Sequence, residues 1–445
     1  MRNQELKQRV LTEIDAASGR MIELGEDIYR HPELGFKEVR TAGIVADEFQ
    51  RLGLGFHEEL AVTGVKTTVS GAGPGPTVAI IGELDSVLVA DHEQADPLTG
   101  AAHCCGHNAQ IATMLGAANG LVRSGVLDQL AGNVVFFAVP AEEYVELEFR
   151  LGLREQGVTR YLGGKSELVR IGAFDDVDMA MMVHAYVSDD GTTIGHLNES
   201  VNGFVGKRAR FIGRAAHAGG RPQDGLNALY AAQLALEAIN AQRETFRDAD
   251  SVRIHPILSR AGDLVNVIPS DVRLETMIRG KTLDAIRDAD HKVDRALRVG
   301  AIALGCDVEI TSMPGYLPLT NDDRMAHLFK ENFLHFHGEE TWSHGGHGSF
   351  STDMGDLSAI MPIIEPNVAG FAGTFHGSDW RIVDHELAYL LPAKLMAMTV
   401  IDLLANNAEE GRAVIDAYQP IMTRSEYLAF MEDAGRVELF QGGGG

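Results

Sequence analysis

The stretch "AAHCCGHNAQ" at residues 101–110 places His103, Cys104, Cys105 and His107 within five positions. Thiolate and imidazole are the ligands that zinc and similar cations prefer. Cys105 and His107 are two residues apart, around a glycine, in a predicted loop between a strand and a helix. Both side chains can therefore face one point. A cysteine buried by packing and a histidine that caps the following helix would explain the same residues equally well.

Two adjacent carboxylates, Glu142 and Glu143, end the apolar run "NVVFFAVPAEE". Tandem glutamates are usually solvated, but at the end of a buried strand two carboxylates need a compensating cation. Because consecutive side chains of a strand point to opposite faces, one could bind a metal while the other faces a substrate as a base. His184 ends another apolar run, and His376 lies in "GTFHGSD". Each histidine alone is a weak candidate, but the set together predicts one metal site.

Short apolar runs would deliver most of these side chains. The predicted elements are buried strands over 77–85, 133–143 and 177–186 and helices over 5–30, 39–53 and 111–122. The first strand delivers Asp85 to its C-terminal end. Strands that alternate with helices and each end in a polar side chain are typical of an open α/β sheet with its site along one edge.

From about residue 197 the pattern changes. "FVGKRARFIG" and "VRLETMIRG" alternate apolar and polar residues, and helical segments follow at 225–242 and 282–304, which favours an antiparallel sheet backed by helices. "FAGTFHGSD" and a helix over 386–405 return to the first pattern. The predicted organisation is a discontinuous α/β domain over 1–196 and 313–435, an inserted α+β domain over 197–312 and a flexible tail over 436–445.

Composition excludes several classes of partner. The 445 residues contain 63 Asp and Glu against 38 Lys and Arg, a formal charge of −25, which would repel nucleic acid and anionic membranes. Three cysteines, two of them adjacent, make no disulfide framework and favour a reducing compartment. The N-terminus lacks the apolar core of a signal peptide, and Pro392 and Lys394 interrupt the most apolar run. We therefore expect a cytoplasmic protein with no nucleic-acid or membrane partner.

Several stretches resemble one family and occur in its order: "HPELGFKE", the strand that ends at Asp85, "HCCGHN", "PAEE", "VHAY", "AAHAGGRPQDGLNAL", "NVIPSDVRLETMIRG", "STDMGDLS" and "GTFHGSD". They resemble the M20 metallopeptidase and amidohydrolase family, in the branch that contains aminobenzoyl-glutamate hydrolase subunits. The resemblance runs across nearly all of the chain. It implies that the inserted domain is a ferredoxin-like lid and dimerisation domain, and that the protein is a homodimer through it.

The resemblance also implies roles for individual residues. The implied metal ligands are Cys105, His107, Glu143, His184 and His376. Five ligands exceed the needs of one tetrahedral ion, so we expect two divalent cations, zinc or manganese, that share a bridging water. Glu142 matches the general base, and Asp85 would orient a ligand imidazole. Cys104 has no ligand counterpart and is interpreted as packing.

In the inserted domain, His217 resembles the histidine that stabilises the tetrahedral oxyanion, often from a partner subunit. Asn266 and Arg279 resemble residues that hold the substrate's carboxylate, which a guanidinium can bind through two hydrogen bonds. A helix-capping role remains the alternative for His217. Arg221 and Arg273 remain alternatives to Arg279.

The function expected is hydrolysis of the amide bond of an N-acyl amino acid or a dipeptide-like, aminobenzoyl-glutamate-like conjugate, with Glu142 as general base. The alternative is a non-catalytic metal-binding or regulatory subunit, which the presence of both Glu142 and His217 disfavours. A thiol amidase that uses Cys104 or Cys105 is a further rival, and it predicts inactivation by alkylation and indifference to chelators.

Two segments near the predicted site have no assigned role. The stretch 144–165 is longer than the segment that usually follows the glutamate pair in this family. We expect this stretch to influence which substrate is accepted. "WSHGGHGS" offers His344 and His347 as further ligands, although a Gly-rich cleft loop is the favoured interpretation.

Overall fold

The computed structural model describes residues 2–188 and 191–443, which form two compact units. Unit 1 comprises Met1–Glu199, Thr320–Gly346 and Asp356–Thr423. Unit 2 comprises Ser200–Leu319, His347–Gly355 and Arg424–Gly445. The sequence predicted a discontinuous plan of this kind. The structure additionally assigns two later stretches, 347–355 and 424–445, to unit 2.

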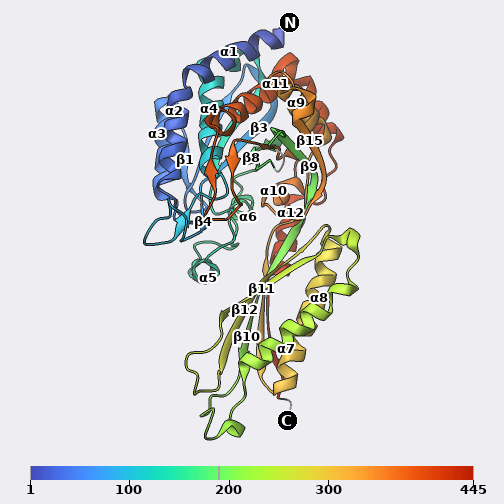
Figure 1. The fold of residues 1–445 in the computed structure, drawn as a ribbon. Helices are drawn as coiled ribbons and strands as arrows, with labels where there is room; N and C mark the ends of the chain where they lie inside the picture. The colour runs from blue at the N-terminus through green and yellow to red at the C-terminus, as the bar shows by residue number, and fades with distance from the viewer. Residues whose placement is uncertain (1, 189–190, 444–445) are drawn as a thin grey trace. The chain divides into compact units, whose positions relative to one another are not determined.

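Unit 1 is built on a six-stranded sheet with the order β1-β2-β6-β3-β7-β16 (Figure 1). Its strands are β1 (His57–Leu60), β2 (Gly64–Ser70), β6 (Ala131–Val139), β3 (Gly73–Glu83), β7 (Met179–Met181) and β16 (Ile363–Ile364). The pairs β6–β3, β3–β7 and β7–β16 are parallel, while β1–β2 and β2–β6 are antiparallel. The predicted α/β class with a mostly parallel sheet is confirmed.

Unit 1 also contains helices. They are α1 (Arg2–Ala16), α2 (Ser18–Tyr29), α3 (Val39–Arg51), α4 (His107–Arg123), α5 (Leu147–Glu155), α6 (Gly164–Arg170), α9 (Asp323–Phe333) and α11 (Leu391–Ala417). The short helix α10 (Met354–Ser358) begins in unit 2 and ends in unit 1. α4 and α11 pack against β3 and against each other. The segment Glu386–Ala417 is long and apolar enough to cross a membrane, but 89% of its most apolar window is buried inside the protein. We therefore interpret this segment as a helix of the protein core.

The strand predicted over 177–186 is split into two pieces. β7 belongs to the six-stranded sheet, and β8 (His184–Ala185) pairs in parallel with β17 (Asn367–Val368). A second small sheet has the order β14-β9-β17-β8, in which β14 is Leu319–Thr320 and β9 is Gly195–Val201. β15 (Trp342–Gly348) pairs with β9. The Gly-rich cleft loop expected at 342–349 is thus wrong over 342–348, which form a strand.

Unit 2 is an antiparallel five-stranded sheet with the order β11-β12-β10-β13-β20. Its strands are β11 (Arg253–Arg260), β12 (Asp271–Gly280), β10 (Gly203–Ile212), β13 (Asp307–Pro314) and β20 (Arg436–Gln441). α7 (Ala228–Ala241) and α8 (Leu283–Leu304) lie side by side on one face (Figure 1). Alternate residues of β12 are buried, as expected for a sheet with one covered face. The predicted α+β insert is confirmed.

The end of the described chain differs from the predicted flexible tail. Arg436–Gln441 form β20, which pairs with β13 after the short helix α12 (Arg424–Ala434). Arg436 donates to Asp290 and Asp294 of α8 at 2.8 and 2.7 Å, and the buried Lys207 lies between the same carboxylates. These long-range ion pairs hold the strand, and local composition could not predict them.

Candidate metal centre

Cys105 lies at the centre of a cluster of ligand-type side chains in unit 1. Its Sγ is 3.4 Å from Nε2 of His184, and ligand atoms of Cys105, His107 and His184 lie within 4.8 Å of one another. Those of Cys105, Glu143 and His376 meet the same limit, and Nε2 of His376 is 3.2 Å from Oε1 of Glu143. The structure thus brings together all five side chains that the sequence predicted as ligands. Cys105 belongs to both groups.

A third group adjoins the cluster at the end of β3. Oε2 of Glu83 lies 3.0 Å from Nε2 of His107, and Oε2 of Glu142 lies 4.0 Å from the same nitrogen. All three side chains are buried. Glu142, the predicted general base, therefore lies beside one ligand histidine, while its neighbour Glu143 lies beside His376.

The loop that precedes α4 depends on the glycine between its two ligands. Gly106 has a φ of +96°, in the left-handed region that residues with a Cβ seldom adopt. A Cβ at this position would lie 2.7 Å from Cβ of Ala185. The backbone N–H of His376 donates to the carbonyl of Cys104 at 2.9 Å, which ties the second ligand loop to the first. His107 is the first residue of α4.

The sequence predicted that the two adjacent glutamates lie at the end of a strand. In the structure they lie on a turn. β6 ends at Val139, and Ala141 adopts a φ of +54°, a conformation that is costly without glycine and gathers at functional sites. Oδ2 of Asp85 accepts the N–H of Glu143 at 2.8 Å. The backbone carbonyl of Asp85 accepts a hydrogen bond from Nδ1 of His107 at 3.0 Å, so Nε2 of the His107 ring faces the cluster.

Burial and charge act in opposite directions on His107. Burial lowers the pKa of its imidazole, but the carboxylates of Glu83 and Asp85 outweigh burial and raise that pKa to about 10. Burial, together with the charge of Glu143, raises the pKa of the Cys105 thiol well above its usual value. Without a cation the cluster therefore holds protons on two of its ligand side chains. A divalent cation would take the place of those protons.

The chemistry of the donor set fits divalent cations. Nε2 of His107 is buried and makes no aligned hydrogen bond among the residues that the structure describes. Four carboxylates, a thiol and a lysine share this region: Glu83, Asp85, Glu142, Glu143, Cys105 and Lys165. With the thiol ionised their net charge is about −4, which two divalent cations would neutralise, since buried charge must be compensated. Thiolate and imidazole favour a borderline-soft ion such as zinc.

Glu83 and Lys165 belong to this region but were not predicted from the sequence. Oε1 of Glu83 accepts a hydrogen bond from the fully buried Lys165 at 2.5 Å, and Gln110 donates to Oε2 at 2.9 Å. Glu83 precedes Asp85 by two residues, so the period of a strand could have placed both on one face. Lys165 is 82 residues away in sequence, and no local pattern pointed to it.

Other candidates from the sequence lie outside the cluster. Burial raises the pKa of the Cys104 thiol to about 12, which leaves it a poor nucleophile near neutral pH and weighs against a thiol amidase. His344 and His347 lie on β15, and neither joins a metal-type group among the described residues. His347 instead contacts Asn202, with Nε2 2.8 Å from its Oδ1.

The remaining predicted residues are in unit 2. Nδ1 of His217 accepts the N–H groups of Gly219 and Gly220 at 3.2 and 3.0 Å, so the proton of the neutral ring is on Nε2. His217 pairs with Val267, next to the exposed Asn266, across an isolated bridge. The structure thus brings His217 and Asn266 together. These hydrogen bonds cap the turn at 218–220 and not a helix, since the next helical element is the short 3-10 helix Pro222–Asp224.

Arg279 lies at the far end of β12 from that bridge. Asp271 begins β12 directly after the loop of Asn266, and eight residues separate it from Arg279, which at about 3.3 Å per residue is a distance of about 26 Å. Nη1 of Arg279 is 3.4 Å from Oγ of Ser351. Arg279 and the bridge of His217 therefore lie toward opposite ends of β12.

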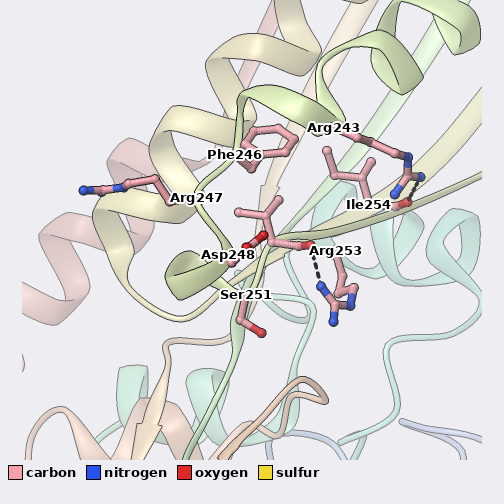
Figure 2. A pocket seen from close by; sticks show the side chains of 8 residues that line it. Arg243, Phe246, Arg247, Asp248, Ser251, Arg253 and Ile254 are labelled. Atoms are coloured by element: carbon pink, nitrogen blue, oxygen red, sulfur yellow. Dashed lines mark hydrogen bonds between the residues drawn. The ribbon is translucent and has the colours of Figure 1, made fainter.

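A separate cavity of about 360 Å³ lies in unit 2 between α7 and β11 (Figure 2). It is lined by Arg243, Phe246, Arg247, Asp248, Ser251, Val252, Arg253 and Ile254. Arg243 donates to the carbonyl of Ile254, and Arg253 to that of Val252, each at 3.0 Å. The third guanidinium, of Arg247, pairs with the carboxylate of Asp250 at 3.1 Å. The lining offers neither a metal-type group nor a buried base.

The fold and the cluster define a two-unit α/β protein with a dinuclear-type ligand set. Residues 200–302 match a family described as the peptidase dimerisation domain of the M20 type. The chain is 27% identical over 434 residues to the Xaa-Arg dipeptidase of Mus musculus, covering 90% of this chain and 89% of that protein. It is 26% identical over 332 residues to the N-acyl-L-amino acid amidohydrolase of Geobacillus stearothermophilus, covering 71% and 82%.

Solved structures agree on the fold. The YXEP protein of Bacillus subtilis, a dinuclear metal binding peptidase from the M20 family, superposes with a TM-score of 0.64 at 19% identity over 88% of this chain and 99% of that one. The aminobenzoyl-glutamate utilization protein of Klebsiella pneumoniae superposes with a TM-score of 0.64 at 20% identity, over 87% and 97%. The matched domain and the YXEP protein are of the M20 type, and the relatives named above are a dipeptidase and an amidohydrolase, enzymes that hydrolyse linear amides.

Proposed function

We propose that the protein is a dinuclear-metal-dependent amidohydrolase that cleaves an N-acyl amino acid or a dipeptide-like conjugate. The observation that carries the proposal is Cys105, which belongs to two separate groups of three ligand-type side chains. A side chain shared in this way suits two cations held close together. Relatives that act on dipeptides and on N-acyl amino acids support the substrate class. The aminobenzoyl-glutamate branch has support from one similar structure.

Each residue of the cluster has its own role in this proposal. Cys105, His107, Glu143, His184 and His376 would hold two divalent cations, zinc or manganese, which when bound acidify water and polarise the scissile carbonyl. Glu142, buried beside the cluster, takes a proton from the attacking water and delivers it to the leaving amine. Asp85 holds the ring of His107 and the backbone of Glu143 in place.

The lid residues act on the substrate in this proposal. Nε2–H of His217 donates to the oxyanion, since Nδ1 already accepts two backbone N–H groups, and Asn266 lies beside it. Arg279 binds the carboxylate of the amino-acid half. Because Arg279 and the bridge of His217 lie toward opposite ends of β12, we propose a homodimer in which each active site takes its oxyanion histidine from the other copy.

The test is hydrolysis of a panel that holds aminobenzoyl-glutamate, N-acetyl and aromatic-acyl amino acids, and dipeptides with basic and neutral second residues. Each substrate is assayed with the protein as purified, after chelation, and after zinc or manganese is restored. We expect activity that chelation removes and one metal restores. Activity that survives chelation, or a protein that binds two metals and hydrolyses no member of the panel, would contradict the proposal.

A further inference from the structure

Helix α5 is attached to unit 1 through a charged group. Of its nine residues, Arg150 is the buried one, and its side chain has no exposed surface. A helix on a protein surface usually buries an apolar stripe. Here the group that enters the interior is a guanidinium, flanked by the rings of Phe36 and Tyr144 at 5.3 and 5.9 Å. A buried guanidinium needs strong partners to offset its lost hydration.

Those partners are three backbone carbonyls, two of them in the turn that carries the two glutamates. Nη1 of Arg150 donates to the carbonyl of Leu162 at 2.5 Å and to that of Ala141 at 3.2 Å. Nη2 donates to the carbonyl of Glu143. The guanidinium therefore binds the peptide group before Glu142 and the peptide group after Glu143.

The N–H groups of the same turn are bound by buried carboxyl groups. Oε1 of the buried Glu38 accepts the N–H of Ala141 at 2.8 Å, and Oδ2 of Asp85 accepts the N–H of Glu143 at 2.8 Å. Ala141 has a φ of +54°, which costs about 1 kcal/mol or more and persists only when its surroundings impose it. The carboxyl groups that accept the N–H groups of the turn, and Arg150, which donates to its carbonyls, supply that constraint.

The loop before α3 is shaped to accept this side chain. A Cβ on Gly35 would lie 2.4 Å from Nη2 of Arg150 and 2.9 Å from Cα of Ala141, so only glycine leaves room for both. Lys37 also contacts two residues of the stretch that contains Arg150. Its Nζ lies 2.8 Å from the carboxylate of Glu146 and 4.1 Å from the ring centroid of Phe149.

We propose that Arg150 is a positioning residue of the metal centre: it fixes the peptide groups of Ala141 and Glu143 and thereby the directions of the Glu142 and Glu143 carboxylates. This inference rests on the proposed function insofar as those carboxylates serve the metal site. It also gives the long segment after the glutamate pair a specific task. The segment 144–162 supplies a part of the centre that none of the ligand-bearing elements contains.

The test compares Arg150→Met and Arg150→Lys in the full chain. Met keeps the volume without donors, and Lys keeps the charge with fewer fixed donors. Lys37→Met is the matched control, because it loosens α5 from outside without touching the turn. Zn²⁺ or Mn²⁺ is titrated into chelator-stripped protein, and kcat and KM are measured after reloading. We expect Arg150→Met to lower metal affinity about tenfold or more and to reduce kcat more than KM, with a smaller loss for Arg150→Lys and none for Lys37→Met.

Metal affinity separates this inference from the proposed function. A wild-type protein that binds two metals but hydrolyses nothing defeats the proposed function, yet the affinities of the Arg150 variants still decide the inference. If Arg150→Met does not fold, Arg150→Lys decides alone, and a loss of about threefold or more supports the proposal. Wild-type metal affinity in the folded variant would overturn it. An equal loss in Lys37→Met would also overturn it, since the effect would then come from α5 as a whole.

Discussion

Nζ of Lys165 lies 2.5 Å from Oε1 of Glu83, and at most 1% of either side chain is exposed. Burial alone would raise the pKa of Glu83, but Lys165 and His107 outweigh burial and hold that pKa below its usual value. Glu83 therefore stays ionised beside the ligand cluster. Lys165 neutralises one negative charge of the anionic centre, and bound divalent cations would neutralise the remaining negative charge.

Replacing Lys165 by Met leaves the Glu83 carboxylate buried without its ammonium partner. Loss of one member of a buried pair costs about 3–5 kcal/mol, so we expect metal-free Lys165→Met to unfold at a much lower urea concentration than the wild type. Added Zn²⁺ should recover part of this loss, because the cation compensates the same carboxylate. Glu83→Gln combined with Lys165→Met should be more stable than Lys165→Met alone, and the reverse order would contradict the pairing.

Substitutions of the two adjacent glutamates should have different effects on activity and on metal content. Glu142→Gln removes the proposed base while the ligands remain, so we expect kcat to fall about 10²–10⁴-fold with little change in bound metal. Glu143→Gln removes a ligand, so metal content itself should fall. Metal analysis and kinetics on the same preparations distinguish the two, and equal metal loss in both variants would refute the division of roles.

Metal uptake should release protons. The pKa of His107 is about 10 in the cluster without a cation, and that of the Cys105 thiol is raised well above its usual value. Both ligands are therefore protonated at neutral pH and must lose a proton to bind. Calorimetric titrations in buffers of different ionisation enthalpy should show at least one proton released, and affinity should rise between pH 6 and 9. Affinity that did not change with pH would show that these groups do not bind the metal.

Glu38 should make the stability of the metal-free protein depend on pH. Burial and the nearby Asp85 raise its pKa to about 7, although hydrogen bonds from Thr63 and Ala141 act in the opposite direction. The folded protein then holds a proton that the unfolded chain loses near pH 4.5, so stability is lost as pH rises from about 4.5 to 7. The difference is about 3 kcal/mol. In urea unfolding, the free energy of unfolding of Glu38→Gln should fall less between about pH 4.5 and 7 than that of the wild type. An equal fall in both proteins would contradict the raised pKa of Glu38.

The sequence predicted what depends on local pattern. Alternation in β12 and the apolar runs of β3 and β6 gave both units, and strand ends placed Cys105, Glu143 and His376 near one point. Arg150, Lys165 and Glu38 were missed because their partners are set by tertiary packing and, for the peptide groups of the turn, carry no sequence signal at all. The turn at Ala141 was missed for a related reason, since its positive φ is imposed by those same side chains.

Mixed dimers test whether active sites share residues between copies. His217→Asn and Glu142→Gln should each be nearly inactive alone. If His217 serves the other copy, a mixed dimer contains one site with both changes and one site with neither, so a re-equilibrated equal mixture should recover about a quarter of wild-type activity. Mixing His217→Asn with Asn266→Ala should recover little, because the two residues lie together on one copy. No recovery in the first mixture would place His217 in its own copy's site, and equal recovery in both mixtures would show that Asn266 does not act together with His217.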